Sequence, residues 1–133
     1  SKAPSDHYKQ KNKQMKKTLI LGATPNPSRY AHFAAHRLTA AGHEIVNIGI
    51  KKGDVAGVPI QLPSEPLQDI DTVTLYIGPK LQEQYYKYLI DTRPKRIIFN
   101  PGTENEQLAT LAKENGIEPV YACTLVLLST GQY

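Results

Sequence analysis

The stretch TLILGATPNPSR at residues 18–29 constrains the fold of this chain more than any other part of the sequence. Its first four residues, 18–21, are apolar or β-branched and predict a buried parallel strand. Small residues at 22–24 predict a tight turn, and Asn26 and Pro27 suit the cap and the first position of a helix. Free N–H groups and the positive end of the helix dipole converge at such a helix start. We therefore expect this loop to hold the phosphates of a nucleotide-like ligand.

Strand-length and helix-length patterns alternate along the rest of the chain, an order that is typical of α/β proteins. We expect strands at 18–21, 44–48, 72–77, 96–99 and 117–121. We expect helices at about 27–41, 78–91 and 103–115, and a short C-terminal helix at 124–129. Residues 53–69, with three prolines and two glycines, predict an extended crossover that includes a short strand or turn at 58–61. The predicted fold is a three-layer, Rossmann-like, doubly wound parallel sheet of about five strands with flanking helices.

Two of the expected helices carry further signals. In the helix at 78–91, apolar or aromatic residues recur at the spacing of one face: Leu81, Tyr85, Tyr88 and Leu89. The helix at 103–115 opens with Thr103 and Glu106, which have the spacing of a capping box. We therefore expect one packed face on the first of these helices and a cap by Thr103 on the second.

The positive charge of the chain is concentrated at its N-terminus. The 133 residues have a formal net charge of +4, but residues 1–17 alone contain six lysines and one aspartate. The remaining 116 residues carry ten basic and eleven acidic groups and are nearly neutral. Because a short lysine-rich arm is more often a solvated extension, we do not expect nucleic acid as a partner. We expect a basic tail at 1–17 and one folded domain at 18–133.

The composition argues against several other classes of protein. Cys123 is the single cysteine, so an internal disulfide framework is excluded. No apolar run approaches the roughly 18 residues that a membrane span needs. The polar N-terminus has no apolar core of a signal peptide. We therefore expect a cytoplasmic protein that does not bind membranes.

Each predicted strand except the last is followed by a turn that contains glycine, namely Gly22, Gly49, Gly78 and Gly102. In an open α/β sheet these turns lie together at the carboxyl edge, where ligands bind at the switch in strand order. A single glycine is explained by turn chemistry alone, so the set is the stronger indication. We expect a ligand cleft at this edge.

The first loop departs from the fingerprint of NAD-binding proteins. That fingerprint is G-x-G-x-x-G, followed about 20 residues later by an acidic residue that binds the ribose. Here Thr24 and Pro27 follow Gly22, and Lys51 and Lys52 stand where the acidic residue is expected. If the two lysines are more than a solvated loop, their ammonium groups favour an extra phosphate, which leaves NADP or coenzyme A.

The same loop, GATPNPSR at 22–29, resembles the G-A-S-x-x-P-x-R/K loop of the CoA-binding domain family. That family has a small Rossmann-like fold related to the nucleotide domain of the succinyl-CoA synthetase α subunit. The resemblance covers about 17–123, and its further landmarks are the turn after the second strand, 57–60, the exit of the third strand, the Asn105–Glu106 pair and Cys123. The chain differs from the family at three strand exits, which read Ile48-Gly49, Gly78-Pro79 and Asn100-Pro101-Gly102.

The resemblance implies that CoA or an acyl-CoA binds at the carboxyl edge. Seven residues of the first loop would hold the pyrophosphate: Gly22, Ala23, Thr24, Asn26, Pro27, Ser28 and Arg29. The first three would bring backbone N–H groups and a hydroxyl, the next three would present the helix N-terminus, and Arg29 would add a charged contact unless it is only a solvated helix residue. At the exit of the second strand lie Gly49 and two lysines, of which Lys51 or Lys52 would reach the ribose phosphate or the adenine. The cleft walls would be Ile77, Gly78 and Pro79 on one side and Gly102, Thr103 and Asn105 on the other.

Catalytic chemistry is not evident in the sequence, which offers no set of nucleophile, base and orienting group. His32 and His36 have the i, i+4 spacing of a metal pair but no third ligand, so we interpret them as surface or partly buried histidines. We interpret Cys123 as a buried structural thiol. We therefore expect a non-catalytic CoA-binding protein without a metal, which acts as a carrier, sensor or partner subunit and could form a homo-oligomer. The alternatives are a small NADP-dependent or other nucleotide-using enzyme, and an interaction module whose cleft is vestigial.

Overall fold

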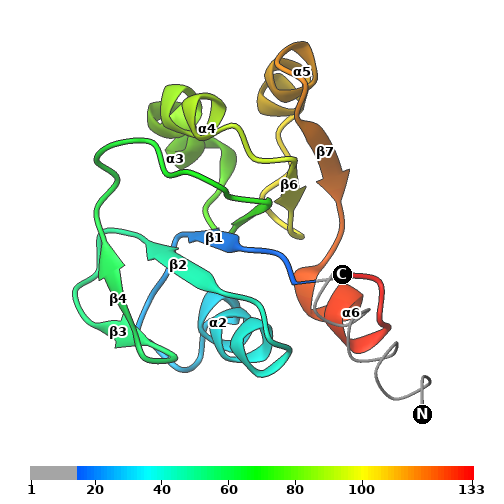
Figure 1. Cartoon of the computed structure of the whole chain (residues 1–133). Coiled ribbons are helices and arrows are strands. Elements are labelled where there is room, and N and C mark those ends of the chain that lie inside the picture. The colour runs from blue at the N-terminus through cyan, green and yellow to red at the C-terminus, as the bar shows by residue number, and fades with distance from the viewer. Residues whose placement is uncertain (1–14) are drawn as a thin grey trace.

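The computed structural model describes residues 15–133, so most of the basic tail expected at 1–17 lies outside the described residues. The described chain forms a seven-stranded sheet with helices on both faces (Figure 1). Its strands are β1 Thr18–Leu21, β2 Ile45–Ile48, β3 Asp54–Val55, β4 Val58–Gln61, β5 Thr72–Leu75, β6 Arg96–Phe99 and β7 Glu118–Tyr121. Its helices are α2 Tyr30–Ala40, α3 Pro79–Gln82, the 3₁₀ turn η1 Glu83–Tyr85, α4 Tyr86–Thr92, α5 Glu106–Glu114 and α6 Thr124–Ser129. The expected Rossmann-like α/β fold is confirmed.

The strands lie in the order β3-β4-β2-β1-β5-β6-β7, and neighbouring strands are parallel except β3 with β4. The chain builds outward from β1 to the β3–β4 hairpin and then returns to place β5 on the other side of β1. The strand order therefore reverses between β1 and β5, which is where open α/β sheets bind ligands. Leu21 lies beside Ile48 and Leu75, and Leu75 lies beside Phe99, so these four strands end at one level.

The two faces of the sheet bury separate apolar clusters. Successive side chains of β1 point to opposite faces, so Leu19 and Leu21 join one cluster and Ile20 joins the other. Helices α4 and α5 cover the first face and α2 and α6 cover the second, on opposite sides of the sheet in Figure 1. Within residues 15–133 no helix is long and apolar enough to cross a membrane.

The β3–β4 hairpin accounts for the difference between about five expected strands and the seven observed. β4 occupies the short strand expected at 58–61, whereas β3 was not predicted. Ala56 and Gly57 connect the two strands with φ angles of 53° and 78°, and such positive values are typical of a tight hairpin turn. The buried Asn47 amide donates to the carbonyls of Val55 and Val58 at 3.2 and 3.1 Å. A two-residue strand that is fixed by a distant side chain leaves no periodicity in the sequence.

Several element boundaries differ from those expected. Three strands are shorter by one or two residues, since β2 begins at Ile45, β5 ends at Leu75 and β7 begins at Glu118. α5 begins at Glu106, and its cap is Asn105, whose Oδ1 accepts the Leu108 N–H at 3.2 Å. The expected cap by Thr103 is wrong, because its hydroxyl donates to the Asn100 carbonyl at 2.8 Å. The C-terminal helix expected at 124–129 is confirmed as α6.

The helix expected at 78–91 is divided into α3, η1 and α4. Tyr85 and Leu89 of the expected face are buried, and Tyr88 packs partly against the core. Leu81, however, is 55% exposed, and its neighbour Gln82 is fully buried. The break therefore changes which side chain of α3 faces inward.

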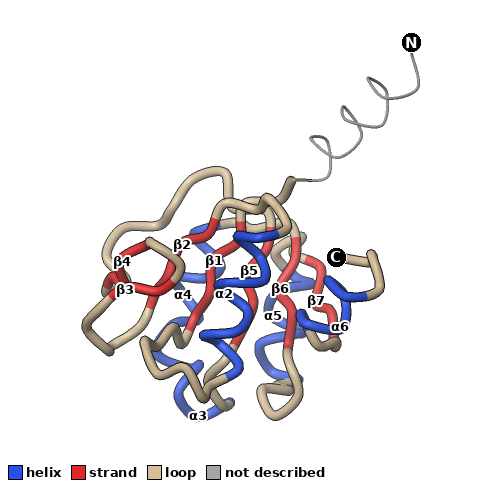
Figure 2. Tube along the Cα trace, turned by 90° about the horizontal axis from the view of Figure 1, so that it is seen from below, coloured by secondary structure: helices blue, strands red, loops and turns tan. Residues whose placement is uncertain are grey.

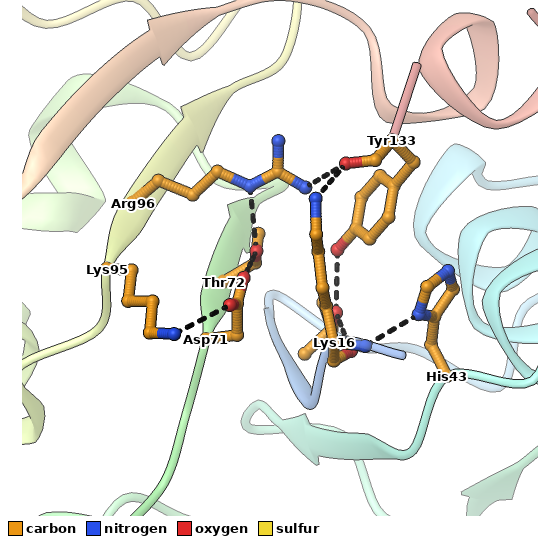
Figure 3. A network of polar contacts seen from close by, with 8 residues as sticks. Lys16, His43, Asp71, Thr72, Lys95, Arg96 and Tyr133 are labelled. Carbon is orange, nitrogen blue, oxygen red and sulfur yellow. Dashed lines mark hydrogen bonds and ion pairs between the residues drawn. The ribbon is translucent and has the colours of Figure 1, made fainter. Parts of the chain in front are cut away.

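A polar cluster lies at the amino edge of the sheet, opposite to the strand exits (Figure 3). The Tyr133 ring lies 4.5 Å from the Arg96 guanidinium carbon and 4.9 Å from the His43 ring, measured to ring centroids. The Tyr133 hydroxyl is 2.6 Å from the Thr18 hydroxyl, and its backbone oxygen accepts from Lys16 and Arg96 at 2.6 and 2.9 Å. This cluster ties the last described residue to the start of β1.

Candidate functional site

A cavity of about 940 Å³ opens at the carboxyl edge of the sheet, where the strand order reverses. Four segments line it: the β1–α2 loop, the exit of β2, the exit of β5 with α3 and η1, and the exit of β6. Figure 2 shows α3 at one edge of the sheet, beyond the ends of the central strands. The segments converge because parallel strands in register end at the same level.

The β1–α2 loop is shaped by its own side chains. Asn26 Oδ1 accepts from the N–H and the hydroxyl of Ser28 at 3.0 and 2.8 Å, and Thr24 Oγ1 accepts from the Asn26 N–H at 3.2 Å. These bonds form local turns of the kind that asparagine and threonine favour. α2 begins only at Tyr30, with Arg29 in the cap position and no side-chain cap bond. The prediction that Asn26 caps this helix is therefore wrong.

The backbone donors of this loop are divided between the protein and the cavity. The N–H groups of Gly22 and Ala23 donate to the Ile48 carbonyl at 2.9 and 3.0 Å. The expectation that these two groups meet a pyrophosphate is therefore wrong. Three other N–H groups have no acceptor among the described residues, and their residues all line the cavity: Thr24, Tyr30 and Ala31. Unpaired donors at the start of a helix make a suitable site for an anion.

Two of the predicted glycines are required by the close approach of neighbouring strand exits. A Cβ atom on Gly22, whose φ is 99°, would lie 2.8 Å from Cγ2 of Ile77. A Cβ atom on Gly49 would lie 2.7 Å from the Ala23 carbonyl oxygen. A side chain at either position would push these exits apart, so both glycines are explained by packing without a ligand.

The charges at the cavity have one sign. Arg29 and Lys51 line it with exposed side chains, and no aspartate or glutamate within residues 15–133 does so. Burial raises the pKa of Tyr76, another lining residue, to about 12, so its hydroxyl is neutral at pH 7. The electrostatic potential of a cleft lined by cations without carboxylates is positive, so it attracts anionic ligands.

The family model of the CoA binding domain matches residues 16–129. The chain belongs to the CoA-binding domain family. The resemblance to this family inferred from the sequence is thereby confirmed. No curated protein matches the chain.

Solved structures similar to this CoA-binding domain have the same fold. The crystal structure of an uncharacterized protein is 55% identical, with a TM-score of 0.88 over 90% of this chain and 98% of that chain. A Thermus thermophilus protein is 20% identical, with a TM-score of 0.77 over 96% of this chain and 98% of its own. A hypothetical protein from Pyrococcus horikoshii OT3 is 23% identical, with a TM-score of 0.77 over 94% of this chain and 89% of its own.

Most of the site residues predicted from the sequence line the cavity of this CoA-binding domain: Gly22, Ala23, Thr24, Asn26, Ser28, Arg29, Gly49, Lys51, Ile77, Gly78, Gly102 and Thr103. Four predicted residues do not line it: Pro27, Lys52, Pro79 and Asn105. The Asn105 amide is used within the fold, since it donates to Gln82 Oε1 and to the Tyr86 hydroxyl, both at 2.9 Å. The cavity therefore brings together the loops that were predicted, but not every residue in them.

Several lining residues were not predicted: Leu21, Tyr30, Ala31, Ile50, Tyr76, Leu81, Gln84, Tyr85 and Pro101. Seven of these lie within two residues of a predicted residue, so widening each predicted turn by two residues would have found all but Gln84 and Tyr85. Leu81, Gln84 and Tyr85 belong to α3 and η1, where the expected continuous helix is broken. The sequence contains no signal for that break.

Gln82 joins the wall after β5 to the wall after β6. Its Nε2 donates to the Ile77 carbonyl at 2.9 Å and to the Thr103 carbonyl at 2.8 Å. Its Oε1 accepts from Asn105, so the fully buried amide is hydrogen-bonded at both ends. A satisfied buried network of this kind fixes the separation of the two walls.

The histidine pair and the cysteine lie outside this arrangement. The rings of His32 and His36 are 4.6 Å apart on α2, and neither residue lines the cavity. No group of three or more His, Cys, Asp or Glu within the described residues could hold a metal ion. Cys123 is partly exposed rather than buried, and it does not line the cavity either.

Proposed function

We propose that this protein binds coenzyme A or an acyl-CoA in the cavity through the loop at 22–29. In this proposal it acts as a carrier, sensor or partner subunit rather than as an enzyme. The observation that carries the proposal is one cavity with unpaired N–H groups and cations but no carboxylate among its described lining residues. Membership of the CoA-binding domain family supports it. CoA fits this set of donors because it carries a pyrophosphate and a separate ribose phosphate.

The proposed pose follows the distribution of these donors. The pyrophosphate lies at the N–H groups of Thr24, Tyr30 and Ala31, with the Arg29 guanidinium beside it. The ribose phosphate lies near Lys51 at the exit of β2. The pantetheine arm then extends along the exits of β5 and β6, where the lining residues are uncharged.

NADP is the second candidate ligand, because Lys51 would suit its extra phosphate as well as that of CoA. A chain that binds neither nucleotide would be an interaction module with a vestigial cleft. The cytoplasmic location and the homo-oligomer expected from the sequence stay predictions.

Isothermal titration of the purified protein with CoA, dephospho-CoA, NADP and NAD tests the proposal. We expect CoA to bind, and dephospho-CoA to bind more weakly because it lacks the ribose phosphate. Tight binding of NADP without a CoA signal would contradict the proposal. Silence for all four nucleotides would favour the interaction module.

Two matched pairs of variants locate the ligand. Arg29→Ala should weaken CoA binding about tenfold, because a charged hydrogen bond is lost. Arg37→Ala, an exposed position of the same helix outside the cavity, should not.

Lys51→Ala should reduce the preference for CoA over dephospho-CoA, whereas Lys52→Ala should preserve it. Equal effects within a pair would remove Arg29 or Lys51 from the site.

A further inference from the structure

Two neighbouring residues of α3 reverse the usual distribution of apolar and polar side chains. Leu81 lines the cavity and is 55% exposed, whereas Gln82 is fully buried. Exposed leucines are common at protein surfaces, but a buried glutamine next to one is an informative exception. The reversal therefore calls for an explanation in terms of the cavity that α3 lines.

Hydrogen bonds hold this reversal in place. Turning α3 so that Leu81 faced the core would break the bonds from Gln82 to the Ile77 and Thr103 carbonyls. Buried carbonyls that lose their partners cost free energy, so the exposed position of Leu81 is fixed by the fold. A large apolar side chain is thus maintained at the edge of the cavity.

The lining also differs in charge from one side to the other. Its two charged residues, Arg29 and Lys51, come from the segment 21–51. The lining contributed by 76–103, to which Leu81 belongs, contains no charged residue. Tyr30 and Ile50, which belong to the segment 21–51 and are 72% and 74% exposed, add apolar surface on the charged side. A ligand held by its phosphates on the first side would extend its other end toward Leu81.

We propose that the preferred ligand is an acyl-CoA with an apolar acyl chain, and that this chain covers Leu81 on the α3 side of the cavity. This inference rests on the proposed function, since it assumes that CoA phosphates bind at the loop 22–29. The apolar groups of the pantetheine arm, a geminal dimethyl group and short methylene pairs, are separated by two amides and form no continuous apolar surface. An alkyl chain on the thioester sulfur supplies that surface. Its burial is favourable in proportion to the apolar area removed from water.

Calorimetric titration with CoA, acetyl-CoA, butyryl-CoA and octanoyl-CoA tests this inference. We expect affinity to rise along the series and octanoyl-CoA to bind at least about tenfold more tightly than CoA, since burial of two methylene groups already gives such a factor. The measured quantity is the ratio of the dissociation constants of CoA and octanoyl-CoA. Leu81→Ser should bring this ratio close to one, and Leu81→Met should retain most of it.

Leu62→Ser is the matched control, because Leu62 is 66% exposed but lies outside the cavity lining. It should leave the ratio at the wild-type value. Equal affinity for CoA and octanoyl-CoA in the wild-type protein would overturn the inference while leaving the proposed function intact. Absence of binding by every member of the series would instead refute the proposed function.

The same variants distinguish the acyl chain from a protein occupant. A dimer detected by sedimentation and lost in Leu81→Ser, together with an unchanged affinity ratio, would assign Leu81 to a contact between two copies of the chain. That result would also overturn the inference.

Discussion

At the scale of single residues, the surroundings of His43 favour its neutral form. Its Nδ1 accepts the backbone N–H of Lys16 at 2.9 Å, which only an unprotonated nitrogen can do. Burial lowers the pKa of His43, and the charges of Lys16 and Arg96 lower it further. Protonation would break this hydrogen bond and add another cation to the cluster around Tyr133 (Figure 3).

We predict that this protein loses stability on mild acidification through His43. The pKa of His43 is lower in the folded than in the unfolded chain. At pH values between these two pKa values, the unfolded chain therefore binds more protons. The contribution of neutral His43 to the free energy of unfolding is complete above about pH 6.5 and is lost as the pH falls through the pKa of the folded chain. Urea denaturation at about pH 7.5 and about pH 5 measures the loss of the free energy of unfolding.

His43→Gln should lose less unfolding free energy between these pH values than the wild type. His36→Gln, at an exposed position of α2, should lose as much as the wild type. Equal losses in all three proteins would show that His43 does not control the acid sensitivity.

At the scale of elements, strands were easier to predict than the ends and breaks of helices. Largely apolar runs placed β1, β2, β5 and β6 within two residues, because burial on both faces leaves a direct mark on the sequence. The edge strand β7, whose residues are exposed or half-buried, also begins within one residue of its expected position. At the hairpin before β4 and at the break after α3, the side chains of Asn47 and Gln82 instead bond to backbone groups outside their own elements. Residue types and spacing do not report such bonds between elements.

The same limit applied to the site. The loop at 22–29 was predicted from its composition and from its resemblance to a family. Which of its N–H groups are free was not predicted, because the N–H groups of Gly22 and Ala23 donate to the Ile48 carbonyl. The position of that carbonyl follows from the register of β1 with β2, in which Leu21 lies beside Ile48. Register is a property of the paired strands rather than of the loop sequence.

Gln82→Leu tests the role of the Gln82 amide in joining the walls after β5 and β6. Leucine has a similar size but leaves the Ile77 and Thr103 carbonyls and the Asn105 amide short of a partner. We predict a loss of about 2–3 kcal/mol in the free energy of unfolding, measured by urea denaturation, and weaker CoA binding. Gln107→Leu, an exposed position on α5, is the control and should change stability by less than about 0.5 kcal/mol. A Gln82→Leu protein as stable as the control would contradict this role.

At the scale of the whole molecule, the proposed ligand site and the Tyr133 cluster lie at opposite edges of one sheet. The strand exits at the carboxyl edge line the cavity, whereas the Tyr133 cluster closes the amino edge. The nearly neutral folded body places Arg29 and Lys51 at the cavity without a carboxylate among the described lining residues. In the proposed function, a phosphate of the ligand therefore meets the start of α2.

An amide-resolved NMR titration of the protein with CoA tests this contact. We predict the largest shifts at the amides of Thr24, Tyr30 and Ala31, because these donors gain an acceptor. The amides of Gly22 and Ala23 should keep the slow hydrogen exchange that their bonds to Ile48 confer. Saturation with CoA that leaves the amides of Thr24, Tyr30 and Ala31 unshifted would show that the phosphates bind elsewhere.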